Sequence, residues 1–487
     1  MIPDGRSFLS LTRRPLYTDR ISAIILIGLI FSVLTEALFP STALRNLSRG
    51  LLLAYLALEW RGIQRNGRVM LAIAGTITLA AVATGAEAGA AGRALDQGAF
   101  FATFFANQFF LREPARSSAL VRRCASFFID QPPARRYGLL TIGGYLFGII
   151  LNLGVLSLLG LMIRQRNSLA SAGGHDEVRS IRERRMLLPL LRGFSVTPLG
   201  SPLSIAMAVL LAVLPGLEWV ELLLLGLTTA GILLTFGWVL DRITAPRHLA
   251  HLVPPPRGQR DPAALAGLVV LVLSVFGLAI IIESAATLPL NRAVLVALPV
   301  AGMVWLAWQY RHFRPVTGGR LVGRRLVREG ARVFPRYRTE IAILSSAGFI
   351  GTMLSTLVPP SLLGAALTGF ALPGPLMPAF FMLLVFLPGL AGMNPIVTVT
   401  ILGSALAAAP ATELPTVVLA LSLISGWALA INASPLTASA MILGDLVNRT
   451  PHEVTLRWNG GFAFSGYLLL SGWFALLVLV LNGRNLF

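Results

Sequence analysis

Two short polar segments interrupt long apolar stretches of this sequence and nearly copy each other. Residues 201–204 read SPLS and precede IAMAVL, and residues 434–437 read SPLT and precede ASAMIL. Serine is a preferred helix N-cap and proline is favoured at the first helical position, so the pattern predicts one helix beginning at Ser201 and another at Ser434. A helix that begins inside a membrane has backbone N–H groups without partners in the helix. In membrane proteins such groups face a substrate or ion cavity.

Polar side chains near four predicted helix starts could bind a solute. The starts follow Asn152, Ser201, Asn394 and Ser434, and each directs about half a positive charge of helix dipole toward one region, which would attract an anion. The substrate-binding residues predicted on this basis are Asn152, Thr197, Ser201, Ser204, Asn394, Thr398, Asn432, Ser434 and Thr437, with Ser195 and Ser439 as further neutral contacts. The alternative is that these small polar groups only cap helices or let them pack closely.

Few charged residues lie at membrane depth. Glu36, Glu59, Glu87 and Glu283 lie closest to membrane depth, and each could carry a proton or mark a helix end. Glu283, which follows an apolar run, is the candidate for ion coupling. The coupling ion would be a proton or Na⁺, and Na⁺ would be bound by backbone carbonyls at the helix breaks and by Ser, Thr and Asn oxygens. Arg192 could neutralise an anion or extend to the cytoplasmic surface. No other cofactor is expected.

The composition is that of a membrane protein. The chain has 487 residues, of which 55% are hydrophobic and 13% charged, with a mean hydropathy of +0.76. The net charge of +19 comes entirely from arginines in short loops, which is the positive-inside pattern and disfavours nucleic-acid binding. Cys124 is the only cysteine, the five histidines lie in polar loops, and no phosphate-binding loop occurs. A zinc site, an ATP-driven pump and an enzyme are therefore disfavoured.

The arginine-rich loops predict the topology. They lie at 1–20, 61–68, 112–136, 164–192, 242–260 and 311–338, and we expect all of them, with the N-terminus, on the cytoplasmic side. The apolar run 21–40 is too long for a signal-peptide core and predicts a first transmembrane helix. A further basic run at 41–49, with Arg45 and Arg49, fits this topology less well.

One short apolar segment separates two of these basic loops. A single crossing would place one of the two loops outside, and two crossings need about 40 residues, which is more than the segment contains. The segment therefore predicts a re-entrant hairpin at 138–163 with its turn at Asn152, the alternative being one tilted helix. A matching hairpin is predicted at 376–410 with its turn near Asn394. A broken helix follows each hairpin, at 187–216 and at 414–447, and a closing helix follows each broken helix, at 219–240 and 461–482.

These parts predict an all-α polytopic membrane protein with about ten transmembrane helices and two re-entrant hairpins. The two halves would form an inverted-topology repeat with broken helices, which is typical of secondary transporters. The predicted divisions are N-terminal helices at 1–68, repeat 1 at 69–242, a linker and connecting helix at 243–289, and repeat 2 at 290–487.

The segment TPLGSPLS at 197–204 resembles the Thr-Pro-Ile-Gly-Thr-Pro-Pro-Asn loop of the ion transporter superfamily, and AINASP at 430–435 would be its second copy. That superfamily includes divalent anion/sodium symporters, arsenite permeases and sodium/proton antiporters of the same fold. The resemblance implies that hairpins and broken helices enclose the substrate and that a transport domain moves in an elevator motion. The symporters' Ser-Asn-Thr hairpin tips are replaced here by LNL at 151–153 and MNP at 393–395, and Ser204 replaces the final Asn. Sodium coupling and dicarboxylate specificity are therefore not carried over.

The function predicted is secondary active transport of a small anionic solute across the bacterial inner membrane by elevator-type alternating access. The partners expected are that solute and the lipid bilayer, with a homodimer as the assembly considered. One alternative is a transporter of a lipid-linked intermediate or a lipid-modifying membrane enzyme, with a lateral groove lined by arginines. Another is a non-transporting membrane subunit of an envelope assembly, without a cavity.

Overall fold

The computed structural model describes residues 16–85, 89–246, 261–357, 372–408 and 414–484, and within these ranges all regular secondary structure is helical. Eight helices of the described chain are long and apolar enough to cross a membrane, and two shorter apolar helices occur at Gly374–Leu390 and Pro395–Ala407. The prediction of an all-α polytopic membrane protein is confirmed, with eight candidate spans where about ten were expected. Some predicted features lie outside the described residues: 1–15, Glu87, 247–260, 409–410 and 485–487.

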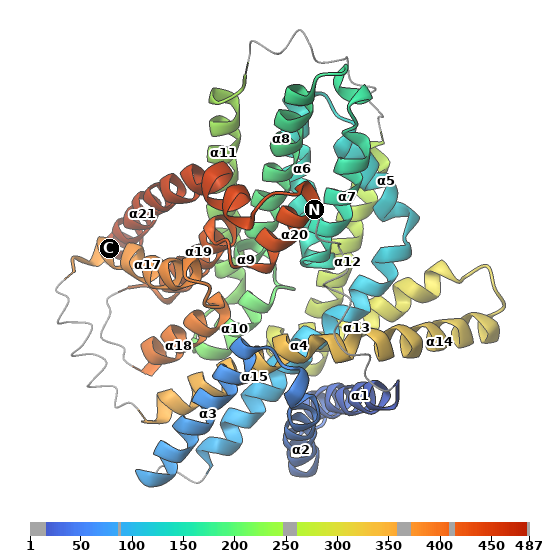
Figure 1. Cartoon of the computed structure of the whole chain (residues 1–487). Coiled ribbons are helices and arrows are strands. Elements are labelled where there is room, and N and C mark those ends of the chain that lie inside the picture. The colour runs from blue at the N-terminus through green and yellow to red at the C-terminus, as the bar shows by residue number, and fades with distance from the viewer. Residues whose placement is uncertain (1–15, 86–88, 247–260, 358–371, 409–413, 485–487) are drawn as a thin grey trace, which may run out of the picture.

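One group of helices lies in the lower part of Figure 1. Within it α4 packs against α13 and α15, α15 against α3, and α1 against α2. The helices are α1 (Leu16–Leu38), α2 (Thr42–Glu59), α3 (Arg65–Ala83), α4 (Ala90–Ser117), α13 (Leu290–Gln309), α14 (Pro315–Val333) and α15 (Arg338–Leu357), with short 3₁₀ turns η1 (Trp60–Gly62) and η4 (Phe334–Tyr337). The basic run at 41–49 lies here with its charges compensated, since Arg45 pairs with Glu36 at 3.2 Å and Arg49 with Asp96 at 2.7 Å.

A second group occupies the upper and left parts of Figure 1 and contains the predicted hairpins and broken helices. Its first half comprises α6 (Pro133–Leu151), α7 (Gly154–Arg166), η2 (Ala170–Ala172), α8 (Asp176–Ser195), α9 (Thr197–Gly200), α10 (Ile205–Val213) and α11 (Trp219–Ile243). Its second half comprises η5 (Gly374–Leu376), α17 (Met377–Leu390), α18 (Pro395–Ala408), α19 (Thr416–Ala433), α20 (Ala438–Val447), the π-helical η6 (Glu453–Arg457) and α21 (Trp458–Arg484). Between the groups, α5 (Ala119–Ile129) packs against α6 and against α12 (Pro262–Ala286), which also contacts α13.

The two halves of the second group pack in the same way. In the first half α6 lies along α8, and in the second half α17 lies along α19. The contacts between halves are reciprocal: α10 packs against α18, while α20 packs against α7, and the closing helices α11 and α21 touch each other. Each half thus has the same order of helix pair, interrupted helix and closing helix. The inverted orientation, the re-entrant course of the pairs and the division at 1–68, 69–242, 243–289 and 290–487 stay predictions.

Glycines allow α6 and α8 to approach closely. A β-carbon at Gly193 of α8 would overlap the carbonyl oxygen of Thr141 in α6, and one at Gly144 of α6 would overlap the carbonyl oxygen of Leu190 in α8. Small residues at a helix–helix contact let two backbones meet, which supplies the van der Waals packing that holds helices together in lipid. The position of α8, which leads into the first interruption, therefore depends on these glycines.

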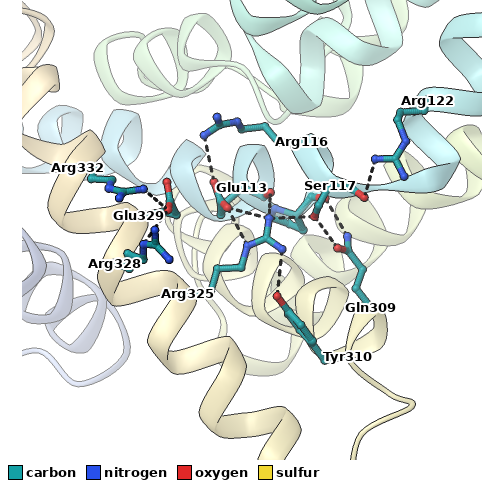
Figure 2. Close-up of polar contacts among 11 residues, drawn as sticks. Glu113, Arg116, Ser117, Arg122, Gln309, Tyr310, Arg325, Arg328, Glu329 and Arg332 are labelled. Atoms are coloured by element: carbon teal, nitrogen blue, oxygen red, sulfur yellow. Dashed lines mark hydrogen bonds and ion pairs between the residues drawn. The ribbon is translucent and has the colours of Figure 1, made fainter.

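A polar clasp joins the C-terminal ends of α4 and α13 to the middle of α14, as Figure 2 shows. Arg325 of α14 pairs with Glu113 of α4 at 2.8 Å and also donates to Ser117 Oγ at 2.9 Å. Ser117 donates to Gln309 Oε1 of α13 at 2.7 Å, and Gln309 Nε2 donates back to the carbonyl oxygen of Pro114 at 2.9 Å. The clasp fixes α14, whose remaining arginines face outward, to the rest of the lower group.

Candidate functional site

The first interruption lies between α8 and α10. Ser201 is extended, with φ −130° and ψ 116°, and its Oγ accepts a hydrogen bond from the backbone N–H of Leu203 at 3.3 Å. The N-cap of α10 is Ser204, whose Oγ accepts from the N–H of Met207 at 3.2 Å. The predicted helix start at Ser201 is therefore wrong by three residues, because Pro202 lies in the connecting turn and not in the first turn of the helix.

The second interruption repeats these contacts. Ser434 Oγ accepts from the N–H of Leu436 at 3.3 Å, and Thr437 is the N-cap of α20, its Oγ1 accepting from the N–H of Ala440 at 3.3 Å. The start predicted at Ser434 is wrong by the same three residues and for the same reason. Ser434 also donates to the carbonyl oxygen of Leu390 at 3.3 Å, which ties the second interruption to the end of α17.

An asparagine lies at each predicted hairpin turn. Asn152 has φ +51° and ψ −135°, a positive-φ conformation that residues other than glycine rarely adopt, and its Oδ1 accepts from the N–H of Leu153 at 2.8 Å. Its Nδ2 donates to Gln108 Oε1 of α4 at 2.7 Å. Asn394 follows Gly392, which has φ +92°, and its Oδ1 accepts from the N–H of Ile396 at 3.0 Å. Asn394 thus caps the start of α18, whereas Asn152 stabilises the turn before α7, whose N-cap is Leu153.

The structure brings some of the predicted site residues together. Asn432 Nδ2 donates to Ser195 Oγ at 2.6 Å, which joins the end of α19 to the end of α8. The short helix α9 packs against both α19 and α11. Ser201, Asn432 and Ser434 are fully buried. The two interruptions therefore belong to one packed region in which residues distant in sequence meet.

Other predicted residues are engaged locally. Thr197 donates to the carbonyl oxygen of Phe194, Thr437 to that of Ser434, and Thr398 to the sulfur of Met393, while Ser439 contacts Thr437. These contacts all lie within five residues along the chain. Substrate binding by the nine predicted residues stays a prediction.

Glu283 lies apart from the interruptions. It occupies the last turn of α12, is partly exposed, and accepts a hydrogen bond from Trp219 Nε1 at the start of α11 at 3.1 Å. In the described chain no hydrogen bond or ion pair links Glu283 to the residues of either interruption. Its role in ion coupling stays a prediction.

Sequence reasoning missed a buried polar network beside the second interruption. Arg192 is only 4% exposed, so its predicted extension to the surface is wrong. Its Nε donates to Asn459 Oδ1 at 2.9 Å, and Asn459 Nδ2 donates to Asn432 Oδ1 at 2.8 Å. Asn459 stands as a lone amide at the start of the long apolar helix α21, which was the available signal.

A cationic surface lies at the polar end of α6, α8 and α11. Burial and, to a smaller extent, the neighbouring charges of Arg182 and Arg185 together lower the pKa of Arg136 at the start of α6 to about 10, while Asp241 opposes the shift. Arg185 of α8 pairs with Asp241 of α11 at 2.6 Å. The three arginines outnumber the carboxylate of Asp241, so positive charge predominates at this end.

The interrupted helices belong to a multi-pass membrane protein whose described residues form only helices. No family model matches the chain, and no curated protein matches it significantly. Among solved structures fourteen chains match. One is the YdaH transporter of Alcanivorax borkumensis, described as having an unusual topology, with 13% sequence identity and a TM-score of 0.50 over 79% of this chain and 87% of that one. The likeness concerns the fold.

Proposed function

We propose that this protein is a secondary active transporter of a small anionic solute, working in the bacterial inner membrane by elevator-type alternating access. The observation that carries the proposal is the pair of interruptions at Ser201 and Ser434, which have the same side-chain contacts and meet in one packed region. Interrupted helices at the meeting point of two repeats are how many secondary transporters form a substrate site. The likeness in fold to a transporter supports the same conclusion.

The anionic nature of the solute rests on electrostatics. The helices α10 and α20 begin at the interruptions, and a helix N-terminus carries about half a positive charge that is poorly screened in a medium of low dielectric constant. In the described chain, no carboxylate takes part in the hydrogen bonds of the four hydroxyl residues at the interruptions, Ser201, Ser204, Ser434 and Thr437. The region is thus positively polarised and suited to an anion.

The finer parts of the proposal combine the family resemblance with the topology predicted from the arginine-rich loops. The two halves form an inverted repeat of the kind found in the ion transporter superfamily, with re-entrant hairpins at 138–163 and 376–410, and the reciprocal packing of α10 on α18 and α20 on α7 supports it. The N-terminus lies in the cytoplasm, and the coupling ion is Na⁺ or a proton, with Glu283 as the candidate carboxylate. The protein is not an enzyme, and it works as a homodimer.

Uptake into proteoliposomes tests the proposal. Purified protein is reconstituted, and uptake of labelled phosphate, sulfate, succinate and glucose is measured with a sodium gradient and a pH gradient imposed separately. We expect at least one oxyanion to accumulate above empty liposomes and glucose not to. Uptake of glucose alone would contradict the anionic part, and uptake of no solute in the panel would contradict the proposal.

A further inference from the structure

Arg192 is a charged side chain held inside the protein by neutral partners. It lies on α8, and its Nη1 donates to Tyr137 OH of α6 and to the carbonyl oxygen of Gly237 of α11, both at 3.1 Å. Its Nε donates to Asn459 of α21, and its guanidinium carbon lies 4.2 Å from the centre of the Phe462 ring. The side chain is thus positioned by three other helices, none of which supplies a negative charge.

The charge of Arg192 has no counter-ion among the described residues, where it forms no ion pair with a carboxylate. Arg185, two turns earlier on the same helix, pairs with Asp241 at 2.6 Å. A buried arginine without a carboxylate is costly in a membrane protein, and such residues mark functional sites. An anion beside the guanidinium would supply the missing charge.

Hydrogen bonds connect Arg192 to both interrupted helices. Asn459 Nδ2 donates to Asn432 Oδ1 at 2.8 Å, Asn432 Nδ2 donates to Ser195 Oγ at 2.6 Å, and Ser195 Oγ donates to the carbonyl oxygen of Arg192 at 2.8 Å. Together with the bond from Arg192 Nε to Asn459, these hydrogen bonds form a closed cycle that begins and ends at Arg192. Because Asn432 lies two residues before Ser434, the orientation of the guanidinium is tied to the second interruption.

We propose that Arg192 is the specificity-determining charge of this site, and that it selects an oxyanion (a carboxylate, sulfate or phosphate group). Asn459 is a positioning residue that holds the guanidinium through its Nε, and Asn432 is a positioning residue that holds Asn459. A guanidinium forms charge-assisted hydrogen bonds with oxyanions, and it keeps its charge at every physiological pH. This inference rests on the proposed function, since it names the residue that makes the transported solute an anion.

Anion-dependent stabilisation of the purified full-length protein tests the inference. The midpoint of thermal unfolding is measured in detergent while sodium phosphate, sulfate or succinate replaces sodium chloride at constant ionic strength. We expect wild-type protein to be stabilised by at least one of the three. Arg192→Gln should weaken the apparent affinity for that anion at least tenfold, and Arg192→Lys should restore part of it.

Two further variants separate a charge requirement from a packing role. Asn459→Asp places a carboxylate against Arg192 but loses the Nδ2 donor to Asn432, so it should remove the anion response, and a cooperative thermal transition in chloride checks that the variant folds. Arg184→Gln is the matched control, because Arg184 lies on the same helix, is exposed, and contacts Trp458 near the start of α21. It should respond to the anion as wild-type protein does.

Several results would overturn the inference. They are an unchanged anion response in Arg192→Gln or in Asn459→Asp, an equal loss in Arg184→Gln, and the absence of any response in wild-type protein. If Arg192→Gln does not fold, Asn459→Asp decides alone, since it keeps the arginine. The uptake assay judges the proposed function separately: oxyanion uptake that persists in Arg192→Gln would leave the transporter standing and remove Arg192 from its selectivity.

Discussion

The buried network predicts an order of stabilities for two asparagine variants. Asn432→Ala removes two hydrogen bonds between helices, those to Ser195 and from Asn459, and one within α19 to the carbonyl oxygen of Ala428. Ser195 keeps its bond to the carbonyl oxygen of Arg192, and Asn459 Nδ2 keeps the backbone oxygen of residue 432 at 3.2 Å. No partner is left without a bond. At about 0.6 kcal/mol for each interhelical hydrogen bond in a membrane protein, we expect a loss of about 1–2 kcal/mol.

Asn459→Ala should cost more. It removes the acceptor of Arg192 Nε and leaves a charged donor buried without that partner. An unsatisfied buried group costs about 1–3 kcal/mol and a charged one more, so the total expected is about 2–4 kcal/mol. The double variant should then show a coupling of about 0.6–1.7 kcal/mol between the two asparagines.

Reversible unfolding measures these values. The protein is titrated with sodium dodecyl sulfate in mixed micelles and tryptophan fluorescence is recorded. Ser425→Ala is the control, since Ser425 is buried on α19 and its hydroxyl has no partner in the described chain, and its stability should not fall. A larger loss for Asn432→Ala than for Asn459→Ala, or no coupling between them, would refute the reasoning.

Three further predictions concern packing, transport and the clasp. Gly193→Ala should destabilise by about 1–3 kcal/mol in the same assay, because its β-carbon meets a backbone oxygen, whereas Gly231→Ala, with open space around it, should not. Ser201→Ala loses one weak turn contact, and Ser434→Ala loses the equivalent contact and the bond to the carbonyl oxygen of Leu390. We expect reduced uptake in proteoliposomes for both, with less than about 1 kcal/mol of destabilisation for Ser201→Ala and about 1–2 kcal/mol for Ser434→Ala. Wild-type uptake in both would remove these residues from the site. Glu113→Gln should destabilise by about 1–3 kcal/mol, since it removes the negative partner of the clasp, and unchanged stability would contradict the role given to the clasp.

The positions of the interruptions could be predicted from the sequence, but not their caps. Each SPLS-type segment contains two hydroxyl residues three positions apart, and either can accept a hydrogen bond from a following N–H. The first, Ser201 or Ser434, was chosen because proline follows it. In the structure that proline is part of a turn and the second hydroxyl, of Ser204 or Thr437, caps the helix. The local pattern does not distinguish the two hydroxyls, because the packing around the turn determines which of them caps the helix.

The burial of Arg192 could not be predicted from its own helix. The first half of α8 is rich in arginines, so the sequence pattern favoured a surface position for one more arginine. Its partner Asn459 lies 267 residues away in sequence and Tyr137 lies 55 residues away. Contacts over such separations depend on how the helices assemble, so the residue pattern along one helix does not predict them. The fold class was accessible because hydropathy alone determines it.

An unbalanced charge inside the bilayer makes a protein sensitive to voltage. Moving one elementary charge through the whole membrane field changes the energy by about 2.3 kcal/mol for each 100 mV. Any displacement of α8 along the membrane normal would carry Arg192 through part of that field, whereas a bound monovalent anion travelling with it would cancel the effect. The membrane potential of the cell would then bias the position of α8 in the empty protein and have little effect on it in the anion-bound protein.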